Sequence, residues 1–370
     1  MVVSTARGRI VALLTLGAIA ACDSGNNAGE PVPASPRAVA SSTAPSAADG
    51  TPDLGAAEQV AQGLDVPWGL AFLPGGDALV AERDSGRILR VSGTQVVPFL
   101  TVPGVAAQGE GGLLGLAVSP DDAFVYAYYT AEQDNRIARF RLDGGGDPEI
   151  VFEGIAKAGN HNGGRIAFGP DGMLYVGTGD AAQTDRSQDP SSPNGKILRL
   201  TPTGDPAPGN PAAGSPVYSL GHRNVQGLAW DAEGRLFAAE FGQNELDKLN
   251  LIEAGHNYGW PEIEGKGDTN GGKYTNPLVA WPTDDASPSG IAIAGGTVYI
   301  AALRGERLWT VPLTGDTVGE PKAQLTGAYG RLRTVEVAPD GALWLTTSNT
   351  DGRGDTRDGD DRILRFPAAD

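Results

Sequence analysis

A phrase of two short apolar strands joined by a tight turn occurs six times in this 370-residue sequence. The third copy reads Arg165-Ile-Ala-Phe-Gly-Pro-Asp-Gly-Met-Leu-Tyr-Val, and Pro-Asp-Gly or an equivalent turn recurs in the others. Proline fixes φ and glycine supplies positive φ, so each copy predicts a β-hairpin. The copies begin at Gly69, Gly115, Arg165, Gly227, Gly290 and Thr334.

A third apolar strand follows most of the hairpins, for example at 87–91 and 196–200. Repeats of about 45 to 60 residues with several strands each are typical of propeller blades. The 54 glycines, 27 prolines and only two methionines also favour short strands and tight turns over long helices. We therefore predict an all-β chain that forms a six-bladed β-propeller with four-stranded antiparallel blades. We expect the stretch 58–62 to complete the last blade and close the ring.

The N-terminus has the pattern of an export signal. Arg7 and Arg9 precede an apolar run, Ile10 to Ala21, that is too short to span a bilayer permanently. The run ends in Ile-Ala-Ala-Cys22, which resembles the lipobox of bacterial lipoproteins, where the cysteine is lipidated. A plain signal peptide with an incidental cysteine is the alternative. Cys22 is the only cysteine, so we expect no disulfide.

Three regions follow from these patterns. We predict a lipoprotein signal peptide over residues 1–22 and a disordered Ala/Ser/Pro/Gly tether over 23–55, since the tether has almost no large apolar residue to bury. The propeller domain is expected over 56–370. The protein is then expected at the cell membrane, facing the periplasm or the cell surface, with membrane contact through its lipid anchor only.

Propeller geometry predicts which residues share a face. In each copy the first strand runs away from one rim and the second returns to it, so residues before the first and after the second strand meet there. The formal net charge of −17 argues against nucleic acid as a partner, and it makes arginines gathered on one rim informative. The rim segments contain Trp68, Glu82, Arg83, Glu110, His161, Asn162, Asp180, Arg223, Asn224, Glu240, Gly242, Ser289, Arg304, Arg331, Arg333 and Asn349.

Six ordered motifs resemble the soluble pyrroloquinoline quinone (PQQ) sugar dehydrogenases, the glucose/sorbosone and aldose sugar dehydrogenase family. The resemblance covers about Leu64 to Pro367. The motifs are Glu110-Gly-Gly-Leu-Leu-Gly, His161-Asn-Gly-Gly-Arg-Ile-Ala-Phe, Gly177-Thr-Gly-Asp, Gly221-His-Arg-Asn-Val-Gln-Gly, Asn257-Tyr-Gly-Trp-Pro and Gly330-Arg-Leu-Arg.

The resemblance implies that three of these residues are catalytic. His161 would take the proton of the anomeric hydroxyl of an aldose while hydride moves to C5 of PQQ, giving a lactone. Imidazole suits this task because its pKa lies near neutrality, and Asp180 would orient it. Arg223 would polarise the C5 carbonyl. The partners implied are a sugar substrate and an electron acceptor outside the membrane.

The resemblance also implies a cofactor site. PQQ carries three carboxylates, and arginine binds carboxylates with a planar fork. Some relatives have glutamine where this chain has Glu110. A carboxylate at this position would repel PQQ unless an arginine or a proton intervenes. The implied cofactor-binding residues are Glu110, Arg223, Asn224, Arg304, Arg331 and Arg333.

Calcium is the second implied cofactor, held by main-chain carbonyls at Gly242 and Gln243. Several relatives have glutamate where this chain has Lys248. The segment 351–361 is rich in Asp and Gly, but it lacks the twelve-residue calcium pattern with a terminal glutamate, so we interpret it as a solvated loop.

Two other functions are compatible with a propeller. One is a calcium-dependent lactonase with a metal at the channel mouth, held by residues such as Glu110, Asp180, Glu240 and Asn349. The other is a non-catalytic cell-surface binding module, since fold does not fix function. The arginines disfavour the lactonase and the paired His161 and Asp180 disfavour the binding module, so a PQQ-dependent sugar dehydrogenase is the function we expect.

Overall fold

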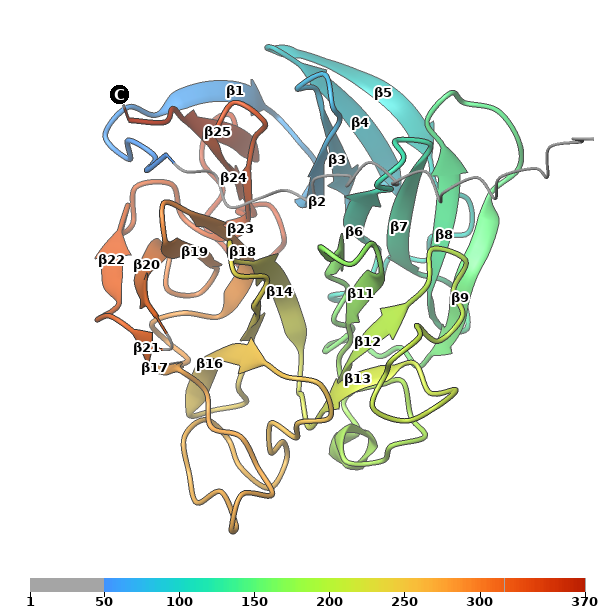
Figure 1. Cartoon of the computed structure of the whole chain (residues 1–370). Coiled ribbons are helices and arrows are strands. Elements are labelled where there is room, and N and C mark those ends of the chain that lie inside the picture. Colours follow the sequence, from blue (N-terminus) through green and yellow to red (C-terminus); the bar gives the residue numbers. More distant parts are fainter. Residues whose placement is uncertain (1–49, 316, 370) are drawn as a thin grey trace, which may run out of the picture. The chain divides into compact units, whose positions relative to one another are not determined.

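The computed structural model describes residues 50–315 and 317–369, and it confirms the six-bladed propeller (Figure 1). Each blade is an antiparallel sheet of four main strands, and blade 5 has a short extra strand. The first strand of each blade contacts that of the next, from β2 through β6, β10, β14 and β18 to β23, and β23 contacts β2 again. The ring is therefore closed.

The blades follow one another in chain order, except that β1 belongs to blade 6. Blade 1 comprises β2 (Pro67–Phe72), β3 (Ala78–Glu82), β4 (Arg87–Ser92) and β5 (Gln95–Thr101). Blade 2 comprises β6 (Leu113–Val118), β7 (Phe124–Thr130), β8 (Asn135–Arg141) and β9 (Glu149–Ile155). Blade 3 comprises β10 (Ile166–Phe168), β11 (Leu174–Gly177), β12 (Lys196–Leu200) and β13 (Val217–Leu220), with a 3-10 turn η1 (Thr184–Ser187).

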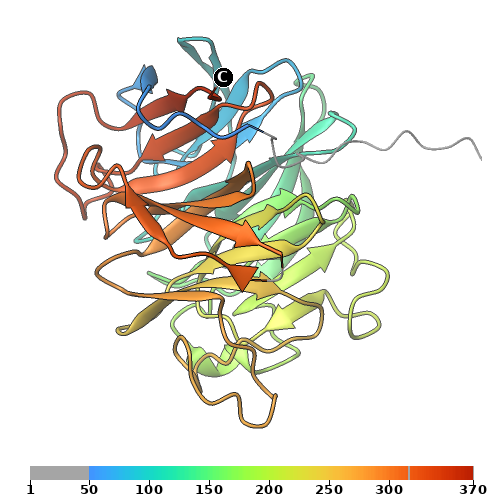
Figure 2. The ribbon, with the colours of Figure 1, turned by 60° about the vertical axis from the view of Figure 1, so that its left-hand side comes forward.

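Blade 4 comprises β14 (Val225–Trp230), β15 (Leu236–Glu240), β16 (Leu246–Ile252) and β17 (Val279–Pro282). Blade 5 comprises β18 (Pro288–Ala294), β19 (Thr297–Ala302), β20 (Arg307–Thr314), β21 (Thr317–Val318) and β22 (Lys322–Gln324). Blade 6 comprises β23 (Leu332–Val337), β24 (Leu343–Thr347), β25 (Arg362–Phe366) and β1 (Glu58–Gln62). The long β16–β17 connection projects from blade 4 in both views (Figures 1 and 2). None of the helices within the described residues has the length and apolarity needed to span a bilayer.

The last blade is closed by the N-terminal strand, as predicted. β1 pairs antiparallel with β25, with Glu58 opposite Arg365 and Gln62 opposite Arg362 (Figure 1). The predicted signal peptide, Cys22 and most of the predicted tether lie outside the described residues, so those predictions remain predictions.

The hydrophobic core is divided among the blade interfaces. Within the described residues, each of six apolar clusters packs chiefly between two neighbouring blades. Successive side chains of a strand point to opposite faces, so Leu79 joins the cluster toward blade 2 and Val80 the cluster toward blade 6. Both faces of each sheet are covered, and β3 is therefore buried along its whole length.

Glycines at the start of several first strands let neighbouring strands approach closely around the axis. A Cβ on Gly115 would lie 2.2 Å from the carbonyl oxygen of Gly164 in the next blade. The Gly115 amide donates a hydrogen bond to that same oxygen at 3.1 Å. Gly69 and Gly227 meet the main chain of the following blade in the same way, at 2.4 Å. Glycine at these positions therefore sets the spacing of the ring.

The substitution Gly115→Ala should accordingly lower the free energy of unfolding by about 2 kcal/mol or more, because the added methyl group overlaps main chain that cannot move aside. Gly75→Ala is the matched control, since a Cβ there meets open space, and it should change stability by less than about 0.5 kcal/mol. Urea denaturation measures both variants. Equal stability of the two would contradict this account of the ring.

A buried ionic cluster lies in blade 4, directly beneath the rim. The Glu240 carboxylate contacts His222 Nδ1 at 2.8 Å and Lys248 Nζ at 2.9 Å, and all three side chains are at most 1% exposed. Glu240 Oε1 also accepts the main-chain N–H of Arg223 at 2.7 Å. Burial raises the pKa of Glu240, but Lys248 and His222 outweigh this effect and the pKa falls to about 2. The cluster thus fixes the main chain of a rim residue.

Removing the charge of Glu240 should show how much this cluster contributes to the free energy of unfolding. Glu240→Gln leaves the Lys248 ammonium buried without its counterion, so we expect a loss of about 3 kcal/mol of unfolding free energy at pH 7. The folded-state pKa is depressed, so the stabilising contribution is present above the ordinary value of 4.5 and is lost as the pH falls toward about 2. Urea titrations across this range should show the difference between wild type and variant shrinking. The exposed Glu233→Gln serves as control, and a deficit for Glu240→Gln that does not change with pH would contradict the assignment.

Candidate functional site

The structure brings His161 and Asp180 together on the rim, as the hairpin geometry predicts. His161 lies between β9 and β10 and Asp180 follows β11, and His161 Nδ1 lies 2.8 Å from Asp180 Oδ1. The indole N–H of Trp260 donates to Asp180 Oδ2 at 2.9 Å, and the Ala182 amide donates to Oδ1. The Asp180 side chain is buried, whereas that of His161 is 13% exposed. Asp180 is thus held on both oxygens and can orient an imidazole that solvent reaches.

These contacts assign the histidine tautomer. An ionised carboxylate only accepts hydrogen bonds, so His161 Nδ1 carries the proton. The other ring nitrogen, Nε2, lies 3.2 Å from the side-chain amide nitrogen of Asn160, a donor. In this tautomer Nε2 is the acceptor that faces the Asn160 amide, and a general base needs such an acceptor nitrogen.

The main chain at His161 adopts an uncommon conformation. Its φ is 56°, in the left-handed region that non-glycine residues seldom occupy. The His161 amide donates to Glu110 Oε2 at 3.0 Å, and its carbonyl accepts the amide of Ala181 at 3.1 Å. Backbone strain maintained by surrounding contacts is characteristic of functional sites.

Arg223 and Asn224 lie beside this pair, just before β14. The Asp180 amide donates to the Arg223 carbonyl, and the Arg223 guanidinium lies 5.4 Å from the centroid of the Trp260 ring. Asn224 Oδ1 accepts the Gly163 amide at 2.9 Å. Arg223 Nε and Asn224 Nδ2 are buried and have no hydrogen-bond partner among the described residues. Two donors near the His161–Asp180 pair are therefore unsatisfied in the described structure.

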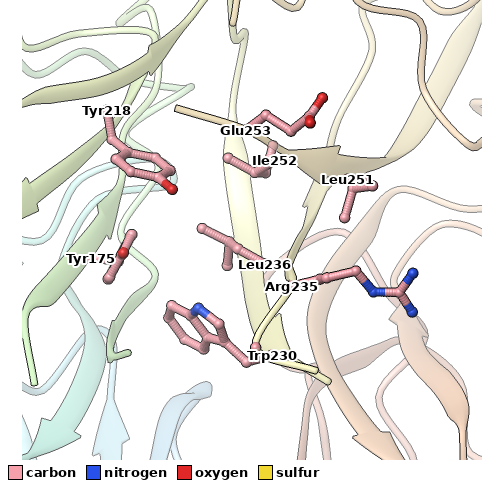
Figure 3. A pocket seen from close by; sticks show the side chains of 9 residues that line it. Tyr175, Tyr218, Trp230, Arg235, Leu236, Leu251, Ile252 and Glu253 are labelled. Atoms are coloured by element: carbon pink, nitrogen blue, oxygen red, sulfur yellow. The ribbon is translucent and has the colours of Figure 1, made fainter. Parts of the chain in front are cut away.

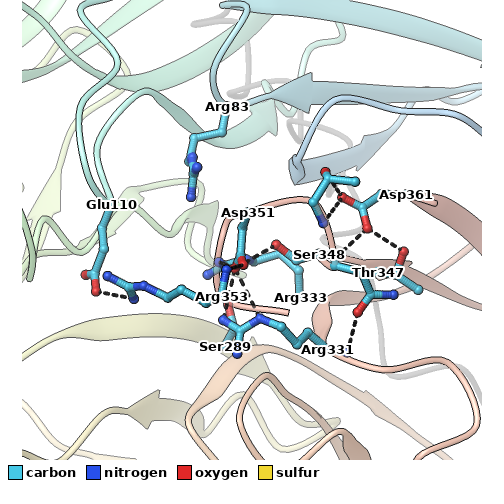
Figure 4. A network of polar contacts seen from close by, with 12 residues as sticks. Arg83, Glu110, Ser289, Arg331, Arg333, Thr347, Ser348, Asp351, Arg353 and Asp361 are labelled. Carbon is cyan, nitrogen blue, oxygen red and sulfur yellow. Dashed lines mark hydrogen bonds and ion pairs between the residues drawn. The ribbon is translucent and has the colours of Figure 1, made fainter. Parts of the chain in front are cut away.

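A second part of the site is an arginine cluster at the start of β23. Arg331 Nη2 lies 2.9 Å from Asp351 Oδ2, and Arg333 Nη2 lies 3.6 Å from the same oxygen (Figure 4). Burial lowers the pKa of Arg333 to about 9, although Asp351 opposes this effect. Arg333 Nε is buried without a partner within the described part of the chain. Arg83 points toward this cluster from blade 1 (Figure 4). Positive charge here exceeds what Asp351 alone can neutralise.

Glu110 lies between the two parts of the site. Its Oε1 accepts a hydrogen bond from Arg353 Nη1 at 2.7 Å, while Oε2 accepts the His161 amide (Figure 4). The arginine required to offset a carboxylate at position 110 is therefore present. Arg353 was not among the predicted site residues, because it lies in the segment interpreted as solvated.

The interpretation of 351–361 as a solvated loop is wrong at both ends of the loop. The Asp351 side chain is 2% exposed and binds the arginines, and Asp361 is fully buried. Asp361 Oδ1 accepts the Asn349 amide at 2.6 Å and the Thr347 hydroxyl at 3.0 Å. Asp351 follows the returning strand β24 on the predicted rim, so strand position was the available signal.

The loop predicted to hold calcium has a different set of contacts. The Gly242 carbonyl accepts a hydrogen bond from Arg223 Nη1, and the amides of Gln243 and Glu245 donate to Glu264 Oε1 at 2.5 and 2.9 Å. The Gly242 carbonyl is thus occupied by a guanidinium, whereas a Ca²⁺ ion needs several oxygen ligands. Among residues 50–315 and 317–369 there is also no group of three His, Cys, Asp or Glu residues placed to hold a metal. None of these contacts uses the Gln243 carbonyl, and the calcium site remains a prediction.

Two predicted rim residues, Arg304 and Glu240, make their contacts outside this site. Arg304 forms an ion pair with Asp284, and both side chains are largely exposed. Leu303 is buried instead, because side chains alternate in direction past the end of β19. Glu240 lies in the buried cluster of blade 4. Asp180 is paired with His161, and Glu110 is paired with Arg353. Within the described residues, the carboxylates considered for a lactonase metal therefore do not form a group that could hold one.

An aromatic pocket of about 400 Å³ lies between blades 3 and 4, away from these residues (Figure 3). Trp230 and Leu236 line it at the ends of β14 and β15 that are opposite the rim, and Tyr175 and Tyr218 complete its wall. None of the predicted site residues lines this pocket. The candidate chemistry is therefore located at the rim.

Comparisons with known proteins agree with this geometry. The solved PQQ-bound form of aldose sugar dehydrogenase from Streptomyces coelicolor is 56% identical, with a TM-score of 0.81, covering 86% of this chain and 100% of that one. Aldose sugar dehydrogenase YliI of Escherichia coli is 30% identical over 331 residues, 78% of this chain and 89% of its own length. Quinoprotein glucose dehydrogenase B of Acinetobacter calcoaceticus is 32% identical over 278 residues, covering 63% of this chain and 58% of its own. The family model described as Glucose / Sorbosone dehydrogenase matches residues 64–364. This chain belongs to the glucose/sorbosone dehydrogenase family.

Proposed function

We propose that this protein is a PQQ-dependent dehydrogenase that oxidises the anomeric C1 hydroxyl of aldoses to lactones and passes the electrons to an external acceptor. The observation that carries the proposal is the position of an oriented, basic histidine, His161, beside buried guanidinium groups with unpaired N–H donors. A binding module would need neither feature. The PQQ-bound state of the Streptomyces relative supports the choice of cofactor.

The residues present fit an anionic quinone. Arg331 and Arg333 would hold its carboxylates, because their charges are only partly offset by Asp351 and Arg333 Nε lacks a partner among the described residues. Arg223 Nε and Asn224 Nδ2 would donate to oxygens of the same ligand nearer His161. Bound PQQ would supply an ortho-quinone that accepts hydride.

His161 performs the proton transfer in this proposal. Its Nε2 takes the proton from the C1 hydroxyl of the sugar, because Asp180 holds the other ring proton at Nδ1. The imidazolium formed is stabilised by the buried Asp180 carboxylate, which Trp260 keeps in place. The Arg223 guanidinium beside the Trp260 ring keeps positive charge close to where the ligand oxygens would lie.

The test is dye-linked oxidation of an aldose panel by protein purified without PQQ. Activity should appear only when PQQ is added. His161→Gln should lower kcat by about a hundredfold or more while PQQ affinity stays within about threefold of wild type, because the base is lost but the cofactor contacts remain. Arg333→Met should weaken PQQ binding about tenfold or more, because a charge-assisted contact is lost.

Arg141→Met is the matched control, since Arg141 is an exposed arginine paired with Asp143 and lies on the outer part of blade 2. It should leave both activity and PQQ affinity unchanged. Parallel assays with a chelator and with added Ca²⁺ test the predicted metal requirement. A wild-type protein that neither binds PQQ nor oxidises any aldose in its presence would overturn the proposal.

We also propose that the enzyme acts outside the cytoplasm, held at the membrane by a lipid on Cys22. The support is the apolar run that ends in the lipobox-like sequence. Cys22→Ser should move the protein from the membrane fraction to the soluble extracytoplasmic fraction, and mass spectrometry of the wild-type N-terminal peptide should detect the lipid. A Cys22→Ser protein that stays with the membrane would contradict this anchor.

A further inference from the structure

The Glu110–Arg353 ion pair joins two distant parts of the rim. Glu110 precedes β6 of blade 2, and Arg353 follows β24 of blade 6 (Figure 4). The Arg353 side chain is 56% exposed and that of Glu110 is 17% exposed. The pair therefore lies where the site meets solvent.

Glu110 has a structural task that requires its position to be kept. One oxygen accepts the amide of His161, the residue with the left-handed main chain. Burial raises the pKa of Glu110, but the hydrogen bonds from Arg353 and from the His161 amide outweigh burial, so the pKa lies below its ordinary value. The residue that supports His161 is therefore a full negative charge at neutral pH.

That charge faces a site proposed to receive an anion. Arg353 is fixed in register with the arginine cluster, because its amide donates to Asp351 Oδ1 at 2.9 Å while Asp351 Oδ2 binds Arg331. Asp351 thus places the loop from which the Arg353 guanidinium reaches across to Glu110. Without that guanidinium, Glu110 would repel a ligand carboxylate bound close to it.

We infer that Arg353 is a positioning residue of the cofactor site, whose guanidinium neutralises Glu110 so that Glu110 can support His161 while the site still admits a multiply charged anion. This inference rests on the proposed function. With the ion pair in place, a carboxylate at position 110 can hold the His161 amide while the site binds a tricarboxylate.

The effect should appear in anion binding and not in folding. Ion pairs with an exposed partner contribute little to stability, so apo Arg353→Ala should unfold at nearly the temperature of wild type. Its affinity for PQQ should fall about tenfold, because Glu110 is left ionised and unpaired at the site. The second substitution Glu110→Gln removes the repelling charge but keeps a side-chain oxygen for the His161 amide.

The experiment measures PQQ binding by calorimetry for wild type, Arg353→Ala, Glu110→Gln, and the double variant. We expect the double variant to return to within about threefold of wild type, a rescue that a purely structural role would not give. Arg141→Ala is the control for loss of an exposed, paired arginine and should bind PQQ as wild type does.

Two results would overturn the inference: PQQ affinity of Arg353→Ala equal to that of wild type, or a double variant as weak as Arg353→Ala alone, which would mean that Arg353 contacts the ligand itself. Failure of the wild-type protein to bind PQQ would overturn the proposed function instead. The same four proteins would then be compared with citrate, a tricarboxylate probe, and the same order of affinities is required for the ion pair to have the role inferred here.

Discussion

Both ends of each inner hairpin return to the same rim, and the rest of the site depends on this constraint. It brings residues that are far apart in sequence into contact, such as His161 with Asp180 and Glu110 with Arg353. Several neighbouring first strands approach each other through glycine, as Gly115 does against the Gly164 carbonyl. The geometry of the chemistry is therefore set by main-chain packing at the axis.

Buried arginines distinguish this rim. A strongly acidic chain buries arginines at this rim, and two of them, Arg331 and Arg333, share the single carboxylate of Asp351. Burying a guanidinium is costly, and Arg223 and Arg333 each keep a buried N–H donor without a partner in the described structure. An anionic ligand with several oxygens, such as the proposed PQQ, would satisfy these donors.

Much of this arrangement could be predicted from the sequence, because hairpin turns and strand alternation are local. The same rule that places Asp180 on the rim also places Glu240 opposite Val225, and Glu240 was among the predicted rim residues, whereas its contact with His222 was not predicted. Trp260 belongs to the Asn257-Tyr-Gly-Trp-Pro motif, but its bond to Asp180 depends on the path of the long β16–β17 connection. Arg353 was missed because composition suggested a solvated loop, whereas burial of Asp351 fixes that loop against the arginines.

The central claim is that the basic Nε2 of His161 and the arginines at the start of β23 face one ligand. A crystal structure of the protein soaked with PQQ and a sugar tests this claim most directly. The account predicts PQQ with its carboxylates against Arg331 and Arg333, and the sugar C1 hydroxyl within hydrogen-bond distance of His161 Nε2. PQQ bound away from these arginines, or His161 directing its protonated nitrogen toward the sugar, would contradict it.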